Sequence, residues 1–426
     1  MIRKIISILC IISILICSHA NNTNASSATE VIELNRHKVI ELALKNFVDV
    51  KLAQLKVDAT KAQLAYVQSQ IDLAGKGINS PAIISLPDTF EEIIASIPNY
   101  DELSEEEQRE LDYIIGIQMM INQSLNPVLE LVGGIQYSTV FTDYMNSVAS
   151  LKQAGITAEK EESIAGIQLE STLELVKYQA TYQYYELLKM QNELEQQQSI
   201  SRELEIHLKD SNVLYSLGLI EKGELDRLQR EYNLQLNLVI DQQKMFDLEL
   251  RKFSTKLGID RKKQVKLQPV SSYTSFIPTD EKKIDMSKMI ELRLVEEEVI
   301  FNKEMAESAN GNNPELLKYY QKITETQTET KAIIKLQISQ YIEALVLEGN
   351  ALINQVNGNE VQYEASQQSV KDIQLLFFAG KVTSKEVETV EFQRDRAHIA
   401  LENSKLEYEI FKEKWLLVTN GVMVNS

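Results

Sequence analysis

The sequence has very little cysteine, and what it has lies at its start. Only two of the 426 residues are cysteine, Cys10 and Cys17, so the rest of the chain cannot supply a disulfide framework or a thiol nucleophile. Basic residues are also few, since 44 Lys and Arg face 62 Asp and Glu and the net charge is −18. This balance argues against binding nucleic acid through a broad basic face.

Proline is absent from two long parts of the chain. Its seven residues leave 128–268, and everything after residue 314, free of proline. Proline breaks helix interiors, and good helix formers such as Glu, Gln, Lys, Leu and Ala dominate these stretches. Both are therefore predicted to form very long helices, and the fold class is predicted to be mainly α.

The first twenty residues have the features of an export signal. Arg3-Lys4 precedes an apolar run over 5–16, and Ser18-His19-Ala20 supplies a small-x-small cleavage pattern. Residues 1–20 are therefore predicted to be a signal peptide, so the protein is expected to be exported from the cytoplasm. A lipoprotein with Cys17 as the lipidated residue is the alternative, which the bulky residue before Cys17 disfavours.

Two glycines point to an internal repeat. Gly218 and Gly380 differ by 162 in number, and each lies between proline-free helical stretches. A seam of side chains follows Gly218 at every seventh position, a spacing typical of coiled-coil helices: Leu225, Tyr232, Val239, Phe246 and Phe253. Adding 162 to these positions gives a second seam, apolar except for its arginine: Val387, Arg394, Leu401, Tyr408 and Trp415.

Two further pairs of similar segments support the duplication. Leu34-Asn35 and Ile284-Asp285 each precede an apolar-periodic segment, with Asn35 and Asp285 at predicted helix N-caps. Tyr184-Tyr185-Glu186-Leu187 also matches Tyr341-Ile342-Glu343-Ala344. We predict two tandem repeats of long antiparallel helical hairpins. The first covers 21–260, with an insert at 76–140, and the second covers 261–426.

In their order and duplication these segments resemble the TolC-like outer-membrane efflux and secretion channels. The resemblance rests on the segment after Leu34-Asn35, the Tyr184–Leu188 stretch, the Tyr215–Ile220 turn and the closing Lys256-Leu257-Gly258. It implies a homotrimer whose hairpins form a tube, a periplasmic adaptor (membrane fusion) protein, an inner-membrane pump and association with the outer membrane. It further implies that the adaptor docks at the hairpin tips, which would here be Leu217, Gly218, Leu219, Ile220, Gly380, Lys381, Val382 and Thr383.

The inserts depart from the family, whose inserted strands form a barrel across the outer membrane. A transmembrane strand needs about 9–11 residues, and a pair needs a turn as well. The segment Ser308–Pro314 is too short for such a pair, and the insert of the first repeat shows no clear alternation, with Ser104–Ile121 typical of a helix. We therefore expect little or no β-barrel.

Enzymatic function has no support in the sequence. There is no nucleophile elbow, no phosphate-binding glycine loop and no zinc signature, and the four histidines include no pair at helical spacing. We therefore predict a non-enzyme without metal or cofactor, acting as a helical conduit for efflux or type I secretion. The alternative is an extracytoplasmic coiled-coil scaffold without a pore.

Overall fold

The computed structural model describes residues 31–75, 85–133, 141–270, 284–309 and 313–424. The predicted signal peptide and Cys17 lie outside the described residues, as do parts of both inserts and residues 271–283.

The first repeat is a strand followed by helices of very different length. Its elements are β1 (Val31–Leu34), α2 (Arg36–Asn46), α3 (Val48–Gly75), α4 (Phe90–Ile94), η1 (Tyr100–Glu102), α5 (Glu105–Gly133), α6 (Phe141–Ser216) and α7 (Lys222–Lys256). The strand β2 (Gln264–Leu267) follows the predicted end of this repeat. Helix α6 has 76 residues, which at about 1.5 Å per residue makes a rod of about 115 Å. The predicted long helix is thus confirmed.

The second repeat has the same plan without the inserted helices. Its elements are η3 (Met286–Lys288), α8 (Ile290–Ala309), α9 (Pro314–Phe378) and α10 (Ser384–Thr419). Asn35 and Asp285 cap the first helix of their repeats, as predicted, by accepting from the amides of Lys38 and Ser287. The mainly α architecture of two hairpin repeats is confirmed.

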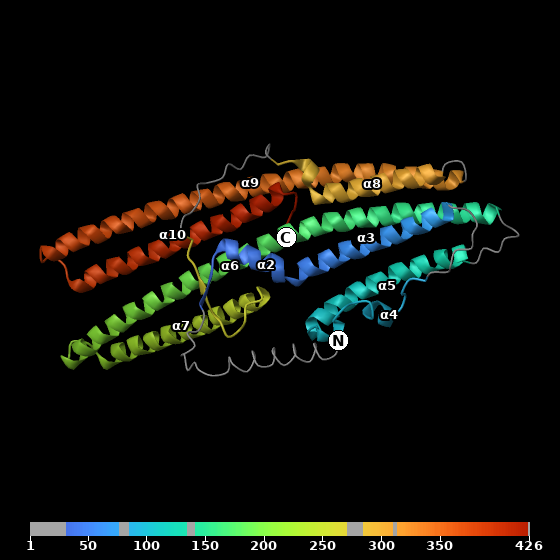
Figure 1. The fold of residues 1–426 in the computed structure, drawn as a ribbon. Coiled ribbons are helices and arrows are strands. Elements are labelled where there is room, and N and C mark those ends of the chain that lie inside the picture. Colours follow the sequence, from blue (N-terminus) through green and yellow to red (C-terminus); the bar gives the residue numbers. More distant parts are fainter. Residues whose placement is uncertain (1–30, 76–84, 134–140, 271–283, 310–312, 425–426) are drawn as a thin grey trace, which may run out of the picture.

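The helices lie roughly along one long axis (Figure 1). The α6–α7 and α9–α10 hairpins reverse at the same end of the molecule, on the left of the view, while α3 and α8 pack along α6 and α9 toward the other end. Helix α6 also packs along α8 and α10, so it joins the two repeats. The hairpins thus form a layer of parallel rods with both tips together.

The insert of the first repeat is helical over its described part. Ser104 and Glu107 form the predicted capping box at the start of α5, with the Ser104 amide 3.0 Å from the Glu107 carboxylate. Two asparagines on α5 then hold the preceding segment: Asn126 bonds both the amide and the carbonyl of Leu86, and Asn122 donates to the carbonyl of Pro87. The insert therefore packs on itself and lies beside α3.

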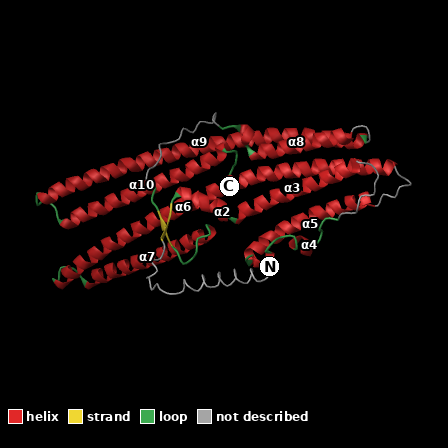
Figure 2. Cartoon of the chain, viewed as in Figure 1, coloured by secondary structure: helices red, strands yellow, loops and turns green. Residues whose placement is uncertain are grey.

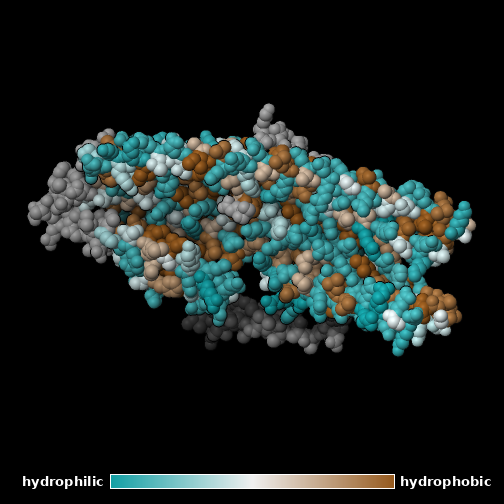
Figure 3. Space-filling model, turned by 180° about the vertical axis from the view of Figure 1, so that it is seen from behind, coloured by the Kyte–Doolittle hydropathy of each residue, from teal (hydrophilic) through white to brown (hydrophobic). Residues whose placement is uncertain are grey.

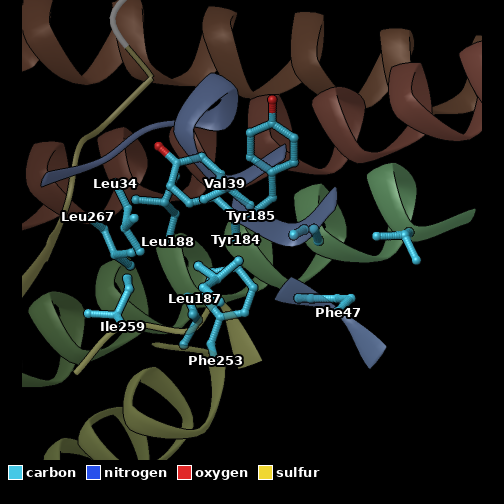
Figure 4. Packing of buried hydrophobic residues seen from close by; sticks show 14 of the residues in the cluster. Leu34, Val39, Phe47, Tyr184, Tyr185, Leu187, Leu188, Phe253, Ile259 and Leu267 are labelled. Carbon is cyan, nitrogen blue, oxygen red and sulfur yellow. The ribbon is translucent and has the colours of Figure 1, made fainter. Parts of the chain in front are cut away.

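The strands within the described ranges form one short parallel pair (Figure 2). Val31 pairs with Gln264 and Leu34 with Leu267, so the start of the first repeat is tied to the segment after its last helix. The pair covers the main core, in which Leu34, Leu267 and Phe253 lie with Tyr184 of α6 (Figure 4). Burial raises the pKa of Tyr184 to about 12, and its hydroxyl donates to the carbonyl of Gln268.

Burial in the two longest helices fixes how the repeats correspond. The buried residues Val176, Ala180, Leu187, Leu194 and Leu208 of α6 become, on adding 162, Ile338, Ile342, Gly349, Val356 and Val370, which α9 buries. The proposed match of Tyr184 with Tyr341 needs a shift of 157 and is wrong in register, because a five-residue offset turns a helix to another face. The repeat itself is confirmed at 162.

Candidate functional site at the hairpin tips

The first tip turns through a glycine-closed helix end. Gly218 has a φ of +71°, which a residue with a side chain adopts only with strain. Its amide donates to the carbonyl of Tyr215 at 2.9 Å, and the amide of Leu219 donates to the carbonyl of Leu214 at 2.9 Å. These two bonds form a Schellman motif, which satisfies the last carbonyls of α6.

The second tip repeats this backbone geometry. Gly380 has a φ of +69°, its amide donates to Phe377 at 2.9 Å, and the amide of Lys381 donates to Leu376 at 2.9 Å. A Cβ on either glycine would meet nothing within 4 Å. The glycines are therefore required by backbone conformation and not by close packing, as expected for a reversal at the far end of a hairpin.

The returning helices start differently at the two tips. Thr383 caps α10 through a full capping box with Glu386, whose carboxylate accepts from the Thr383 amide at 2.7 Å. That bond to the backbone and the Thr383 hydroxyl lower the pKa of Glu386. The corresponding Glu221 of the first tip makes no side-chain cap bond to α7.

Both tips expose apolar side chains to solvent. Leu217 and Leu219 of the first tip are each 66% exposed, and Phe378 at the end of α9 is 84% exposed. Apolar patches appear at the ends of both hairpins when the molecule is seen from behind, with the tips on the right (Figure 3). Exposed apolar groups gathered in this way are typical of a protein-interaction site.

Ion pairs hold the two hairpins side by side near the tips. Lys385 of α10 lies 3.5 Å from Asp210 of α6, and Arg396 of α10 pairs with Glu203 of α6. Six of the predicted tip residues, including Leu219 and Lys381, are exposed and belong to two neighbouring turns. Ile220 and Val382 are half-buried beneath them.

A charged cluster away from the tips was not foreseen from the sequence. The Arg36 guanidinium makes two bonds to the buried Glu413 carboxylate, the longer being 2.9 Å. Lys412 pairs with Glu409, whose pKa burial raises. The cluster borders a cavity of about 1010 Å³ where the first helix meets the last. Isolated charges along a helical sequence gave no signal that these groups would meet.

Two classes of site are not found in the described part of the chain. No group of His, Cys, Asp or Glu there is arranged to hold a metal ion. None of the described helices combines the length and apolar character that crossing a bilayer needs.

Comparison with known proteins gives matches in structure alone. No family model and no curated protein matches the sequence. The Campylobacter jejuni CmeC outer membrane channel aligns over 92% of this chain and 87% of its own, with 11% identity and a TM-score of 0.55. CusC, described for transmembrane channel formation, aligns over 95% and 96%, with 10% identity and a TM-score of 0.59.

A third match is the Vibrio cholerae outer membrane protein VceC, over 92% of this chain and 97% of VceC, with 12% identity and a TM-score of 0.53. The chain has the TolC-like channel fold. The resemblance seen in the sequence is thus confirmed at the level of the fold. The neighbours named here are described as channels or as an outer membrane protein.

Proposed function

We propose that this TolC-like protein is the exported, tube-forming component of an efflux or type I secretion system in the cell envelope, associated with the outer membrane. Three copies enclose a helical conduit. The observation that carries the proposal is the alignment of more than nine-tenths of the chain with outer membrane channels. The tube is passive, and an inner-membrane pump supplies the energy.

The hairpin tips are the proposed docking site for a periplasmic adaptor. Leu217 and Leu219 offer apolar contacts, and Lys381 adds a positive charge at the second turn. Fixed glycine turns present these groups at little entropic cost, because binding does not have to order them. The aromatic pair Phe377 and Phe378, with ring centroids 6.2 Å apart, extends the same apolar surface.

The test is co-purification of the adaptor protein from the same cell with tip variants. Leu217→Asp with Leu219→Asp puts two charges into the exposed surface and should abolish capture while leaving the helical content unchanged. The matched control is Tyr113→Asp on α5, which changes a side chain that is 73% exposed and lies outside both hairpins. Unchanged capture by the double tip variant would contradict the docking site.

A further inference from the structure

Helix α3 is a long helix that is anchored at its start. The helix before it, α2, ends at Asn46, whose side-chain amide donates to the carbonyl of Leu257 at 2.9 Å. The next residue, Phe47, is 7% exposed in the main core and has extended backbone angles, with φ −66° and ψ 133°. Helix α3 follows with 28 residues, or about 42 Å. An extended residue between two helices can absorb a change in backbone angles, so Phe47 is placed as a hinge.

Beyond its first turn, α3 takes no part in the apolar cores. Val50 packs against the main core, and the described clusters of buried apolar residues include no other residue of α3. The neighbouring insert has a small core of its own, around Ile93, Leu111 and Ile115. The extensive packing of α3 is along α6 (Figure 1). The position of α3 therefore depends mainly on its seam with α6.

The seam between α3 and α6 is rich in polar and small side chains. Helix α3 buries five residues, of which three are polar: Val57, Thr60, Gln63, Val67 and Gln70. The part of α6 beside it buries small residues such as Ser147, Ala158 and Ala165. The two helices approach closely, since a Cβ on Gly155 would lie 3.0 Å from the Ile71 Cδ1. A seam of this kind buries little apolar surface, so it supplies little of the hydrophobic free energy that holds other helix pairs together.

Side-chain hydrogen bonds cross this seam at a regular interval. Lys56 donates to the Gln168 side chain at 2.7 Å, and Gln63 donates to the Glu161 carboxylate at 2.9 Å. The two bonds are seven residues apart on each helix. The amide oxygen of Gln63 is buried and has no hydrogen-bond partner among the described residues. Water replaces such bonds when the helices part, and it also reaches the Gln63 oxygen, so separating the helices costs little free energy.

The second repeat has a comparable seam but ties its helix at both ends. In α8, Asn302 is 4% exposed and donates to Gln327 of α9 at 2.9 Å. Helix α8 ends at Ala309, and the cap of α9 follows at Asn313. Helix α3, in contrast, is separated from α6 in the chain by the whole insert at 76–140. The short connection therefore holds α8 against α9, whereas α3 is fixed to the main core only at its first residues.

We propose that α3 is a hinged wall of the conduit. It swings about Phe47 between a closed state packed on α6, which is the arrangement described above, and an open state in which the polar seam is hydrated. The motion widens the tube at the end opposite the tips. The widening rests on the proposed conduit of three copies, whereas the hinge and the seam belong to the single chain.

Hydrogen exchange in the full-length exported protein tests the hinge. An isolated helix frays in water, so the amides of α3 exchange whenever it parts from α6. We expect them to exchange at least about tenfold faster than the amides of α8. Gln63→Leu combined with Gln70→Leu makes the seam apolar and should slow the exchange of α3 by about tenfold.

The matched control makes the same chemical change on the outer side of the same helix. Gln68 is exposed, so Gln68→Leu should leave the exchange of α3 unchanged. Exchange of α3 as slow as that of α8, or equal slowing by the control, would overturn the hinge and leave the conduit standing.

Spin-label distances between copies test the widening. The exported chain is expected to carry no native cysteine, so Ser69→Cys labels the far part of α3 and Lys51→Cys labels its start, both at exposed positions. The label at position 69 should give a broad distance distribution that the double leucine variant narrows, and the label at position 51 a narrow one. Equal widths at the two positions would overturn the widening. A single-chain mass in light scattering would overturn the proposed conduit, and hydrogen exchange would still decide the hinge.

Discussion

Helices α7 and α10 are built on the same repeat and differ in what surrounds them. Helix α10 buries side chains over Ala397–Val418 on several faces, among them Phe411 and the Arg36-bound Glu413, while α7 buries Phe253 and Ser254 near its end. The comparison shows that the two repeats place corresponding helices in different surroundings. Helix α10 lies between α9 and α6, whereas the extensive packing of α7 in the described chain is along α6.

The largest expected effect is on the core of α10. Phe411→Ala removes a ring that is 1% exposed, and deleting a buried aromatic side chain costs about 3–5 kcal/mol of unfolding free energy. The residue of α7 that corresponds to Phe411 under the 162-residue shift is Glu249, and Glu249→Ala should change the unfolding free energy by less than about 0.5 kcal/mol. Urea unfolding followed by circular dichroism measures both, and equal losses would contradict the difference between the helices.

The glycines that end the two helices offer a second contrast. Gly421 after α10 has a φ of +88°, and a Cβ there would lie 2.1 Å from the Lys288 carbonyl oxygen, so Gly421→Ala should cost about 3 kcal/mol. Gly258 after α7 has a φ of +71°, and its Cβ would meet the Asn46 side chain, whose amide donates to the Leu257 carbonyl, and not a backbone atom. Gly258→Ala should cost about half as much in the same urea assay. A larger loss at Gly258 would contradict this ranking.

The next largest difference between α10 and α7 is an ion pair. Arg36→Ala leaves the Glu413 carboxylate, 9% exposed, without its partner, and we expect a loss of about 2 kcal/mol, since the arginine itself is partly solvated. The residue of α7 that corresponds to Glu413 is the exposed Arg251, and Arg251→Ala should leave the stability nearly unchanged. Thermal melts of the two variants provide the comparison, and a neutral Arg36→Ala would show that the pair contributes nothing.

The smallest expected effect lies at the caps. Thr383→Ala should cost about 1 kcal/mol, whereas Glu221→Ala at the equivalent position should be almost silent, because Glu221 makes no cap bond. The pKa of Glu386 is lowered in the fold, so its contribution is present at neutral pH and is lost as the pH falls through that lowered pKa. Melts at neutral and acid pH should therefore show the Thr383→Ala deficit shrinking in acid.

Local patterns predicted the helices and turns well. The proline-free stretches, the caps Asn35 and Asp285 and the turns at Gly218 and Gly380 all depend on neighbouring residues, and the structure has each of them. The order of these segments was enough to indicate the fold. The docking role of the tips stays a prediction.

Features that depend on distant residues were missed. Nothing in the tetrapeptide after residue 263 indicates that it pairs with Val31–Leu34, more than two hundred residues away. The link of Arg36 to Glu413 is equally invisible, because it depends on how the first and last helices pack. The match of Tyr184 to Tyr341 was wrong because similar residue types recur often by chance in helical sequences. Burial is a better guide to the register, because it depends on which face of the helix a residue occupies.

The most direct test of the account is the mass of the exported protein by light scattering, with and without detergent. The account predicts a species of three chains in at least one of these conditions, because the proposed conduit is enclosed only when three copies assemble. A single-chain species in both conditions, over a wide range of concentration, would contradict it and favour a scaffold without a pore.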